Sequence, residues 1–171
     1  MSLDSLERVF SVEDITADLN RILKEHVEVG EALKLIVASP LLGRETLSAA
    51  LGELSEHLIA RLIGGSRTNR SNNGSDLTGP LGERIEVKSR QLSRWGESLM
   101  FDFSRHTVSA SEAYCVAWDD TVAPPVVHAA YRGAVAEFKE RWGVRGQSTY
   151  SIRTNLRKLR AAVDGVGSSL A

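Results

Sequence analysis

The chain has 171 residues, of which 42% are hydrophobic, and its 21 Lys and Arg against 22 Asp and Glu leave a net charge of −1, which suits one globular domain with a sizeable core. No apolar run approaches the ~20 residues that a membrane-spanning helix needs, and the start MSLDSLERVF lacks the regions of a secretory signal. Cys115 is the single cysteine, which excludes an intrachain disulfide and a cysteine zinc cluster, so we expect a cytoplasmic protein without membrane partners.

The small net charge conceals an uneven distribution along the chain. Residues 1–60 carry 11 acidic and five basic side chains, a net charge of −6, whereas residues 61–171 carry 11 acidic and 16 basic ones, a net charge of +5. A basic part joined to an acidic part suits a face that binds a polyanion, backed by a scaffold or dimer surface. An uneven scatter of solvated charges explains the same numbers, so charge alone does not decide between the two.

Residues 1–43 are predicted to form an N-terminal helical region that ends in a turn. Apolar residues recur with helical spacing over residues 12–38, where Gly30 is a candidate break between two helices. Ser11 followed by Asp14 is typical of a capped helix start. The acidic, leucine-rich character of these helices would suit a dimer surface.

The core of the chain is predicted over residues 44–165. A leucine stripe predicts a helix over residues 44–63, which a Gly-Gly pair ends. The polar run SRTNRSNNGSD at 66–76 predicts an exposed loop. The remaining elements are strands at 83–89, 99–103, 113–120 and 124–131, a helix at 133–142, and a strand-like start with a basic helical end at 148–160. We therefore expect an α/β (α+β) fold with helices around a sheet, and a flexible tail at 166–171.

The sequence GPLG at 79–82 predicts a turn that closes an antiparallel hairpin. Leu77 then lies opposite Ile85, and because side chains alternate along a strand, both face the core together with Val87.

The same register places Asp76 opposite Glu86, on the other face of the hairpin with Lys88. Two opposed carboxylates repel each other unless a cation lies between them, and oxygen ligands suit Mg²⁺. A neighbouring lysine adds a positive charge for a phosphate oxygen or a metal-bound water, so this group has the equipment for phosphodiester hydrolysis. A solvated hairpin face with an ordinary ion pair is the alternative.

These residues resemble a known active-site motif. Ser-Asp at 75–76, nine intervening residues and Glu-Val-Lys at 86–88 are similar to the pattern of the PD-(D/E)XK nuclease superfamily, with Ser75 in place of the usual proline. Gly52 and Glu56 form a G-x-x-x-E arrangement that resembles the preceding helix of archaeal-type Holliday junction resolvases. The order of features over about residues 50–145 is most similar to small PvuII-like type II restriction endonucleases.

The resemblance implies a restriction-endonuclease-like fold, with a mixed central sheet flanked by helices. It implies that Asp76, Glu86 and Glu56 hold Mg²⁺, for which Mn²⁺ can substitute, and that Lys88 positions or activates the water. Glu53, one turn earlier in the helix, is the alternative to Glu56. It further implies a homodimeric deoxyribonuclease that cuts double-stranded DNA and leaves 5′-phosphate and 3′-hydroxyl ends.

Basic and polar residues next to the motif are candidates for DNA contact, because Arg binds phosphates and Arg and Asn can read base edges. They are Arg67, Asn69, Arg70, Asn72, Asn73, Arg90, Arg94, Arg105 and His106. A generic polar surface is the alternative for each of them.

Two other functions remain open at this point. One is a structure-specific nuclease that acts on junctions or in repair, which the G-x-x-x-E helix favours. The other is a non-catalytic nucleic-acid-binding or interaction module, whose hairpin charges are merely solvated.

Overall fold

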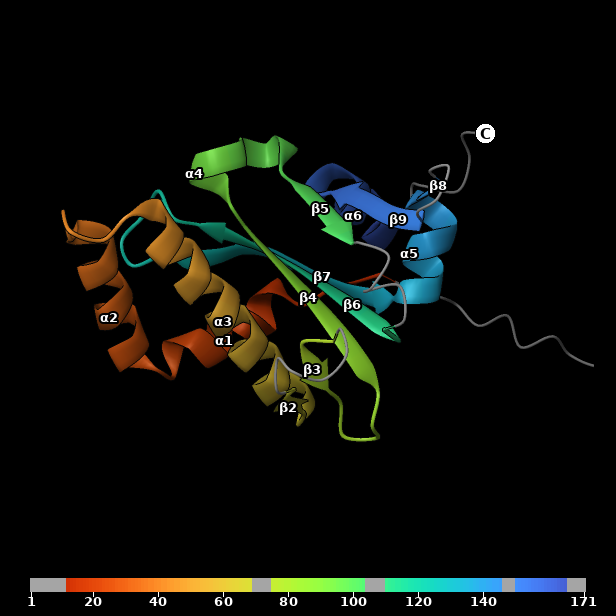
Figure 1. Cartoon of the computed structure of the whole chain (residues 1–171), viewed down its shortest axis with the longest axis horizontal. Helices are drawn as coiled ribbons and strands as arrows, with labels where there is room; N and C mark the ends of the chain where they lie inside the picture. The colour runs from red at the N-terminus through yellow and green to blue at the C-terminus, as the bar shows by residue number, and fades with distance from the viewer. Residues whose placement is uncertain (1–11, 69–74, 104–109, 146–149, 166–171) are drawn as a thin grey trace, which may run out of the picture.

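The computed structural model describes residues 12–68, 75–103, 110–145 and 150–165 as a mixed α/β structure (Figure 1). Within these residues, six α-helices accompany a mixed sheet of six strands and a separate sheet of three strands. The predicted class, a mixed sheet with flanking helices, is confirmed. The predicted tail at 166–171 lies outside the described residues.

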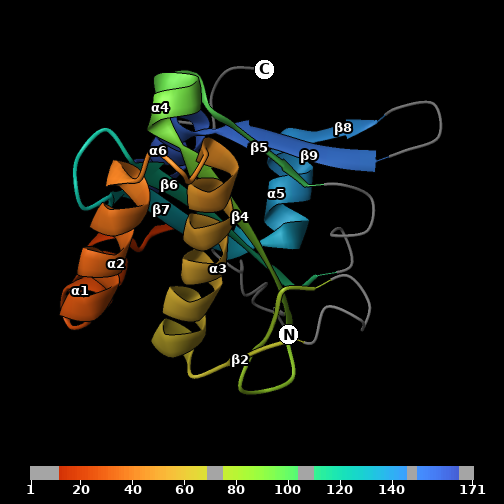
Figure 2. The same ribbon diagram turned by 60° about the vertical axis from the view of Figure 1, so that its left-hand side comes forward.

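Three helices near the N-terminus cover one face of the large sheet (Figures 1 and 2). The first elements are β1 (Glu13–Asp14), α1 (Thr16–Lys24), α2 (Val27–Ala38) and α3 (Arg44–Ile63). Leu19 of α1, Leu33 of α2 and Leu51 of α3 are buried in one cluster with Ile85 of the sheet. The hydrophobic stripes that predicted these helices therefore all face the same sheet.

Two details of the helical region correct the predictions. The helical run is interrupted at residues 25–26, and Gly30, the predicted break, lies inside α2. A lone glycine costs a helix only about 1 kcal/mol relative to alanine, which packing readily outweighs. The first helix begins at Thr16, whose backbone N–H donates to Asp14 Oδ1 at 2.9 Å. The N-cap position is Ile15, which forms no side-chain capping bond, so Asp14 binds the start of the helix from one residue before the cap, while Ser11 lies outside the described residues.

The large sheet has the strand order β1-β7-β6-β4-β3-β2. Its other strands are β2 (Ser66–Arg67), β3 (Leu77–Thr78), β4 (Arg84–Gln91), β6 (Glu112–Asp119) and β7 (Val126–Ala134). β4 and β6 run parallel, and the other neighbours are antiparallel. The predicted loop over 66–76 is wrong at its start, because Ser66 pairs with Thr78. A strand of two polar residues has no alternation by which the sequence could reveal it.

The second sheet has the strand order β5-β9-β8, in which β5 precedes β6 along the chain and the other two strands follow β7. Its strands are β5 (Met100–Phe103), β8 (Gly143–Arg145) and β9 (Tyr150–Asn155). The helices of this part of the chain are α4 (Leu92–Trp95), the 3₁₀-helix η1 (Gly96–Ser98), α5 (Val135–Trp142) and α6 (Leu156–Val163). The predicted change from strand to basic helix is confirmed at Asn155, whose side chain accepts a hydrogen bond from the backbone N–H of Lys158 at 3.0 Å.

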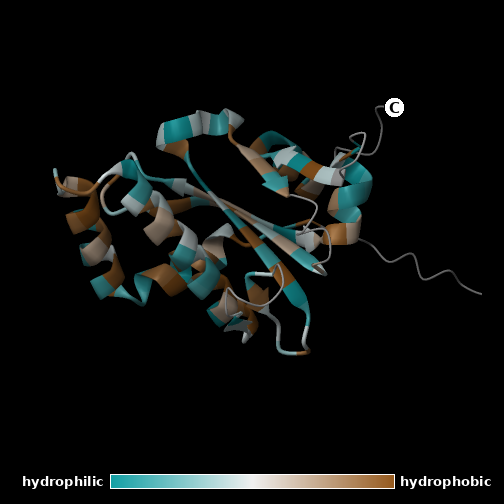
Figure 3. Cartoon of the chain, viewed as in Figure 1, coloured by the Kyte–Doolittle hydropathy of each residue, from teal (hydrophilic) through white to brown (hydrophobic). Residues whose placement is uncertain are grey.

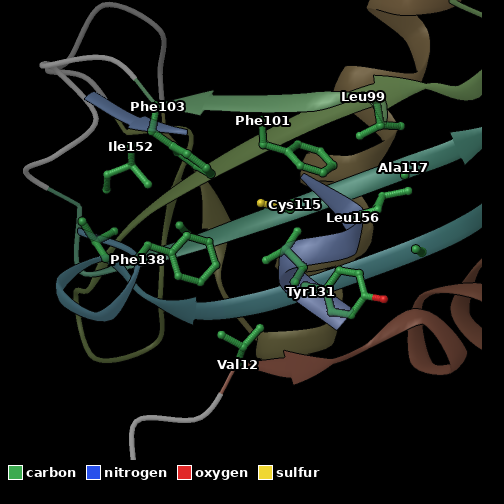
Figure 4. Close-up of a cluster of buried hydrophobic side chains, with 14 of the residues drawn as sticks. Val12, Leu99, Phe101, Phe103, Cys115, Ala117, Tyr131, Phe138, Ile152 and Leu156 are labelled. Carbon is green, nitrogen blue, oxygen red and sulfur yellow. The ribbon is translucent and has the colours of Figure 1, made fainter. Parts of the chain in front are cut away.

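A second hydrophobic cluster fills the space between the two sheets. Phe101 and Phe103 of β5, Cys115 of β6, Phe138 of α5 and Leu156 of α6 belong to it (Figure 4). Cys115 is fully buried, as its apolar neighbours predict. The large sheet is thus covered on both faces, by α1–α3 on one and by the small sheet with α5 and α6 on the other. None of the described helices is both long enough and apolar enough to cross a membrane.

One buried hydrogen bond joins α3 to the large sheet and can be tested. Trp118 Nε1 donates to Ser55 Oγ at 2.9 Å, and Ser55 Oγ donates to the Leu51 carbonyl at 2.8 Å. Ser55→Ala leaves the indole N–H buried without its acceptor, so we expect urea unfolding to show a loss of about 1–3 kcal/mol. Ser98→Ala removes an exposed serine hydrogen bond and should change the unfolding free energy by less than about 0.5 kcal/mol. Equal effects of the two substitutions would contradict this account.

Candidate active site

The predicted hairpin forms with the predicted register. Leu77 pairs with Ile85 and Thr78 with Arg84, so β3 and β4 are joined by the turn at residues 79–83. The backbone N–H of Gly79 donates to the Glu83 carbonyl at 2.8 Å and closes this turn. Gly82 has φ of +86°, a conformation that favours glycine. The local sequence therefore determines the geometry that brings the motif residues together.

Asp76 does not pair with Glu86 as a strand partner, which corrects one part of the prediction. Strand pairing ends at Leu77, and the backbone N–H of Asp76 donates to the Ile85 carbonyl at 2.9 Å. Asp76 Oδ2 instead accepts a hydrogen bond from the backbone N–H of Val87 at 2.8 Å. The carboxylate takes the place that a backbone carbonyl would have in a longer ladder, which fixes it against β4.

Ile85 and Val87 face the helices, and because side chains alternate along a strand, Glu86 and Lys88 lie on the other face of β4. Figure 3 colours the ribbon of β4 by the hydropathy of its residues. Only 3% of Glu86 is exposed, and its carboxylate forms an ion pair with Lys88. Lys88 Nζ also lies 5.9 Å from the centre of the Phe103 ring. The charged pair is therefore set into the apolar layer between the two sheets, which is not the solvated hairpin face of the alternative interpretation.

Burial dominates the electrostatics of Glu86. Loss of solvent raises the pKa of its carboxyl, the hydrogen bond and charge of Lys88 oppose that rise, and the charges of Asp76 and Glu56 add to it. The raised pKa means that Lys88 does not fully compensate the buried negative charge. A further cation near these carboxylates would stabilise the ionised form.

Glu56 and Glu53 both lie on α3, and they differ in their exposure and in their effect on Glu86. The Glu56 side chain is 18% exposed and its charge acts on Glu86, whereas the Glu53 side chain is 55% exposed. Glu56 Oε2 accepts a hydrogen bond from Arg67 Nε at 2.8 Å and forms an ion pair with Arg67 Nη2, also at 2.8 Å. Glu56 is thus the more buried of the two and the one whose charge affects Glu86, while its role as a metal ligand stays a prediction.

Arg67 joins the site in a role that the sequence did not reveal. Its Nη1 lies 2.9 Å from Glu53 Oε1 and 3.1 Å from His57 Nε2, in addition to the bonds with Glu56. Burial acts against its charged form, but hydrogen bonds with Glu53 and Glu56 outweigh burial and raise the pKa of Arg67. Gly64, with φ of +69°, turns the chain back at the end of α3 and brings β2 to that helix. The Gly-Gly pair signals the turn, but not which side chains meet across it.

The three carboxylates do not form a ready-made metal cage. Among the described residues, no group of three or more His, Cys, Asp or Glu side chains is arranged to hold a metal ion. Each carboxylate has its own partner instead, which is a backbone N–H for Asp76, Lys88 for Glu86 and Arg67 for Glu56. The chemistry of the donors, carboxylate oxygens of which the buried Glu86 is only partly compensated by Lys88, nevertheless suits a hard divalent cation such as Mg²⁺.

The predicted DNA-binding residues fall into two groups. Asn69, Arg70, Asn72, Asn73, Arg105 and His106 lie outside the described residues. The others are described: Arg67 binds Glu53 and Glu56, Arg90 donates to the carbonyls of Met100 and Ser89 at 3.1 and 2.8 Å, and Arg94 lies 5.3 Å from the Trp95 ring centre. Arg94 and Trp95 are exposed on α4, at the far end of β4 from Glu86. None of these contacts tests DNA binding, which stays a prediction.

A scan against protein-family models gives no match, and a search of curated proteins finds none with significant similarity. The function is therefore inferred from the residues of this chain and their geometry.

The buried charge of Glu86 predicts that the free energy of unfolding of the metal-free protein depends on pH. Its raised pKa means that the folded chain holds the proton more tightly than the unfolded chain, so stability falls as the pH rises through and above 4.5, the ordinary glutamate value. Glu86→Gln removes this titration. In urea unfolding with EDTA, we expect its stability relative to the wild type to increase between about pH 4 and about pH 7. Glu140→Gln makes the same change at an exposed position of α5 and serves as the matched control.

Proposed function

We propose that this chain is a Mg²⁺-dependent DNA endonuclease of the PD-(D/E)XK superfamily, of the type II restriction kind. The observation that carries the proposal is the burial of Glu86 beside Lys88, with the charges of Asp76 and Glu56 acting on the same carboxyl. The four side chains come from three separate segments, and the charges of Lys88, Asp76 and Glu56 all act on Glu86. The mixed sheet, with β4 parallel to β6 and antiparallel to β3, supports a restriction-endonuclease-like fold.

The side chains would divide the chemistry among themselves. Asp76, Glu86 and Glu56 would hold Mg²⁺ or Mn²⁺. A metal bound there would polarise the phosphate and lower the pKa of the attacking water. Lys88 positions the water and offers its charge to the phosphate that is being cleaved. The ion pair with Glu86 and the ring of Phe103 restrict where its ammonium group can lie.

Cleavage of plasmid DNA tests this assignment directly. We expect Mg²⁺-dependent cleavage by the wild type, and a loss of about 10²-fold or more in Glu86→Ala and Lys88→Ala, because each removes a charge from the centre of the reaction. Both variants should still bind DNA in a gel-shift assay. Glu140→Ala and Lys158→Ala remove exposed charges elsewhere and serve as matched controls. Cleavage that survives in both site variants would refute the assignment.

Sequencing of the cut ends separates the open alternatives. Cuts at one defined sequence, with 5′-phosphate and 3′-hydroxyl ends, would support a restriction enzyme. Cleavage of branched DNA alone would favour the structure-specific nuclease, for which the position of Glu56 on α3 is an argument. DNA binding without any metal-dependent cleavage would indicate the non-catalytic module.

A homodimer would let the enzyme cut both strands of a symmetric DNA site. The exposed apolar side chains on α2 and the following turn support a dimer surface there, since Leu35 is 73% and Leu41 is 91% exposed. Light scattering should give a mass near twice 18.7 kDa for the wild type and a monomer for Leu35→Glu. Leu81→Glu, at an equally exposed leucine in the β3–β4 turn, should leave the dimer intact. A monomeric wild type would contradict this surface.

A further inference from the structure

Arg67 is the partner that sets Glu56 apart from the other two carboxylates. Asp76 is held by a backbone N–H and Glu86 by a lysine of its own strand. Glu56 is held by a guanidinium from β2, which places Nε and Nη2 on the same oxygen, Oε2. Among the described residues, every hydrogen bond to Glu56 comes from Arg67.

This ion pair opposes a metal ion on Glu56. Arginine keeps its positive charge at all ordinary pH values, so a divalent cation at Glu56 would meet both an occupied oxygen and a like charge. Because Glu53 also binds Arg67 Nη1 at 2.9 Å, the guanidinium has two anchors on α3. In this arrangement Glu56 neutralises Arg67 and is not available as a metal ligand.

A phosphate can replace those anchors. The guanidinium fork binds phosphate oxygens in the same bidentate way as it binds carboxylates. The Arg67 side chain is 29% exposed and its other anchor, Glu53, is 55% exposed, so a phosphate can approach the guanidinium from solvent and replace at least the Glu53 contact at little cost. A polyanion that approaches the site therefore competes with Glu53 and Glu56 for the same group.

We infer that Arg67 gates the metal site: it occupies Glu56 in the DNA-free protein, and a DNA phosphate that binds Arg67 releases Glu56 for the divalent cation. This inference rests on the proposed function. It makes metal binding and DNA binding mutually favourable, since coupling between two sites is reciprocal. Without DNA, the ion pair of Arg67 with Glu56 would therefore keep the occupancy of the site by the divalent cation low.

Mn²⁺ binding to the DNA-free protein tests the gate. Titrations followed by the EPR signal of free Mn²⁺ should show that Arg67→Gln binds Mn²⁺ about threefold to fivefold more tightly than the wild type, the scale of a partly exposed ion pair. Arg61→Gln removes the same charge from the exposed face of α3, where Arg61 pairs with Glu25, and should leave the affinity unchanged. Weaker or unchanged binding in Arg67→Gln would overturn the gate, and weaker binding would make Arg67 a residue that holds Glu56 in place.

The second arm follows DNA binding by the fluorescence anisotropy of a mixed-sequence duplex. One set of samples contains EDTA and a separate set contains Mn²⁺, and each set includes Glu86→Gln and the protein with intact Glu86. In EDTA, Arg67→Gln should bind the duplex more weakly than Arg61→Gln, and equal affinities would overturn the role of the phosphate. If Mn²⁺ binding in the wild type does not depend on Glu86, the proposed function itself fails. If it does depend on Glu86 but Arg67→Gln has no effect, only the gate fails.

Discussion

The burial of one carboxylate, Glu86, is the constraint on which the candidate site depends. A charge in the layer between two sheets is unfavourable unless it is compensated, and Lys88 compensates it only in part. An ordinary hairpin would place such a pair in water at little cost. The chain instead covers it with the small sheet, in which Phe103 lies beneath the lysine. This cost is readily understood under the proposal that Glu86 binds a cation.

β4 connects the hydrophobic core with this charged group. Its apolar side chains, Ile85 and Val87, are buried against the helices, while its parallel pairing with β6 places Glu86 beside Ala113 and Lys88 beside Cys115. Small side chains at these two positions of β6 leave room for the longer charged ones. The packing of the core thus determines where the carboxylate and the ammonium group lie, and any loosening of the sheet would be felt at the site.

The acidic and basic parts of the chain meet at the same place. Glu56 belongs to the acidic N-terminal part and Arg67 to the basic part, and they are joined across the turn at Gly64. The uneven charge of the sequence is therefore not divided between two separate surfaces in this region. It forms a local balance in which each of the three carboxylates has a different type of partner: a backbone N–H, a lysine or an arginine.

Short-range patterns in the sequence were sufficient for the hairpin. Alternation and the glycine-rich turn predicted the register of Leu77 and Ile85, and the leucine stripe predicted α3. Local signals also determined which side chains share a face of β4. They were insufficient where a neighbour far along the chain decides, as at Gly30, which packing keeps inside a helix.

The finer geometry of the site was decided by tertiary structure alone. Asp76 bonds the backbone of Val87 because the ladder ends one residue earlier, and Arg67 meets Glu56 because β2 folds back on α3. Both contacts join residues 11 positions apart, across a turn whose path depends on the whole sheet. The sequence by itself therefore determined the motif residues and the face they share. Only the folded chain decided which partner holds each carboxylate, because that choice depends on distances between segments that no local pattern encodes.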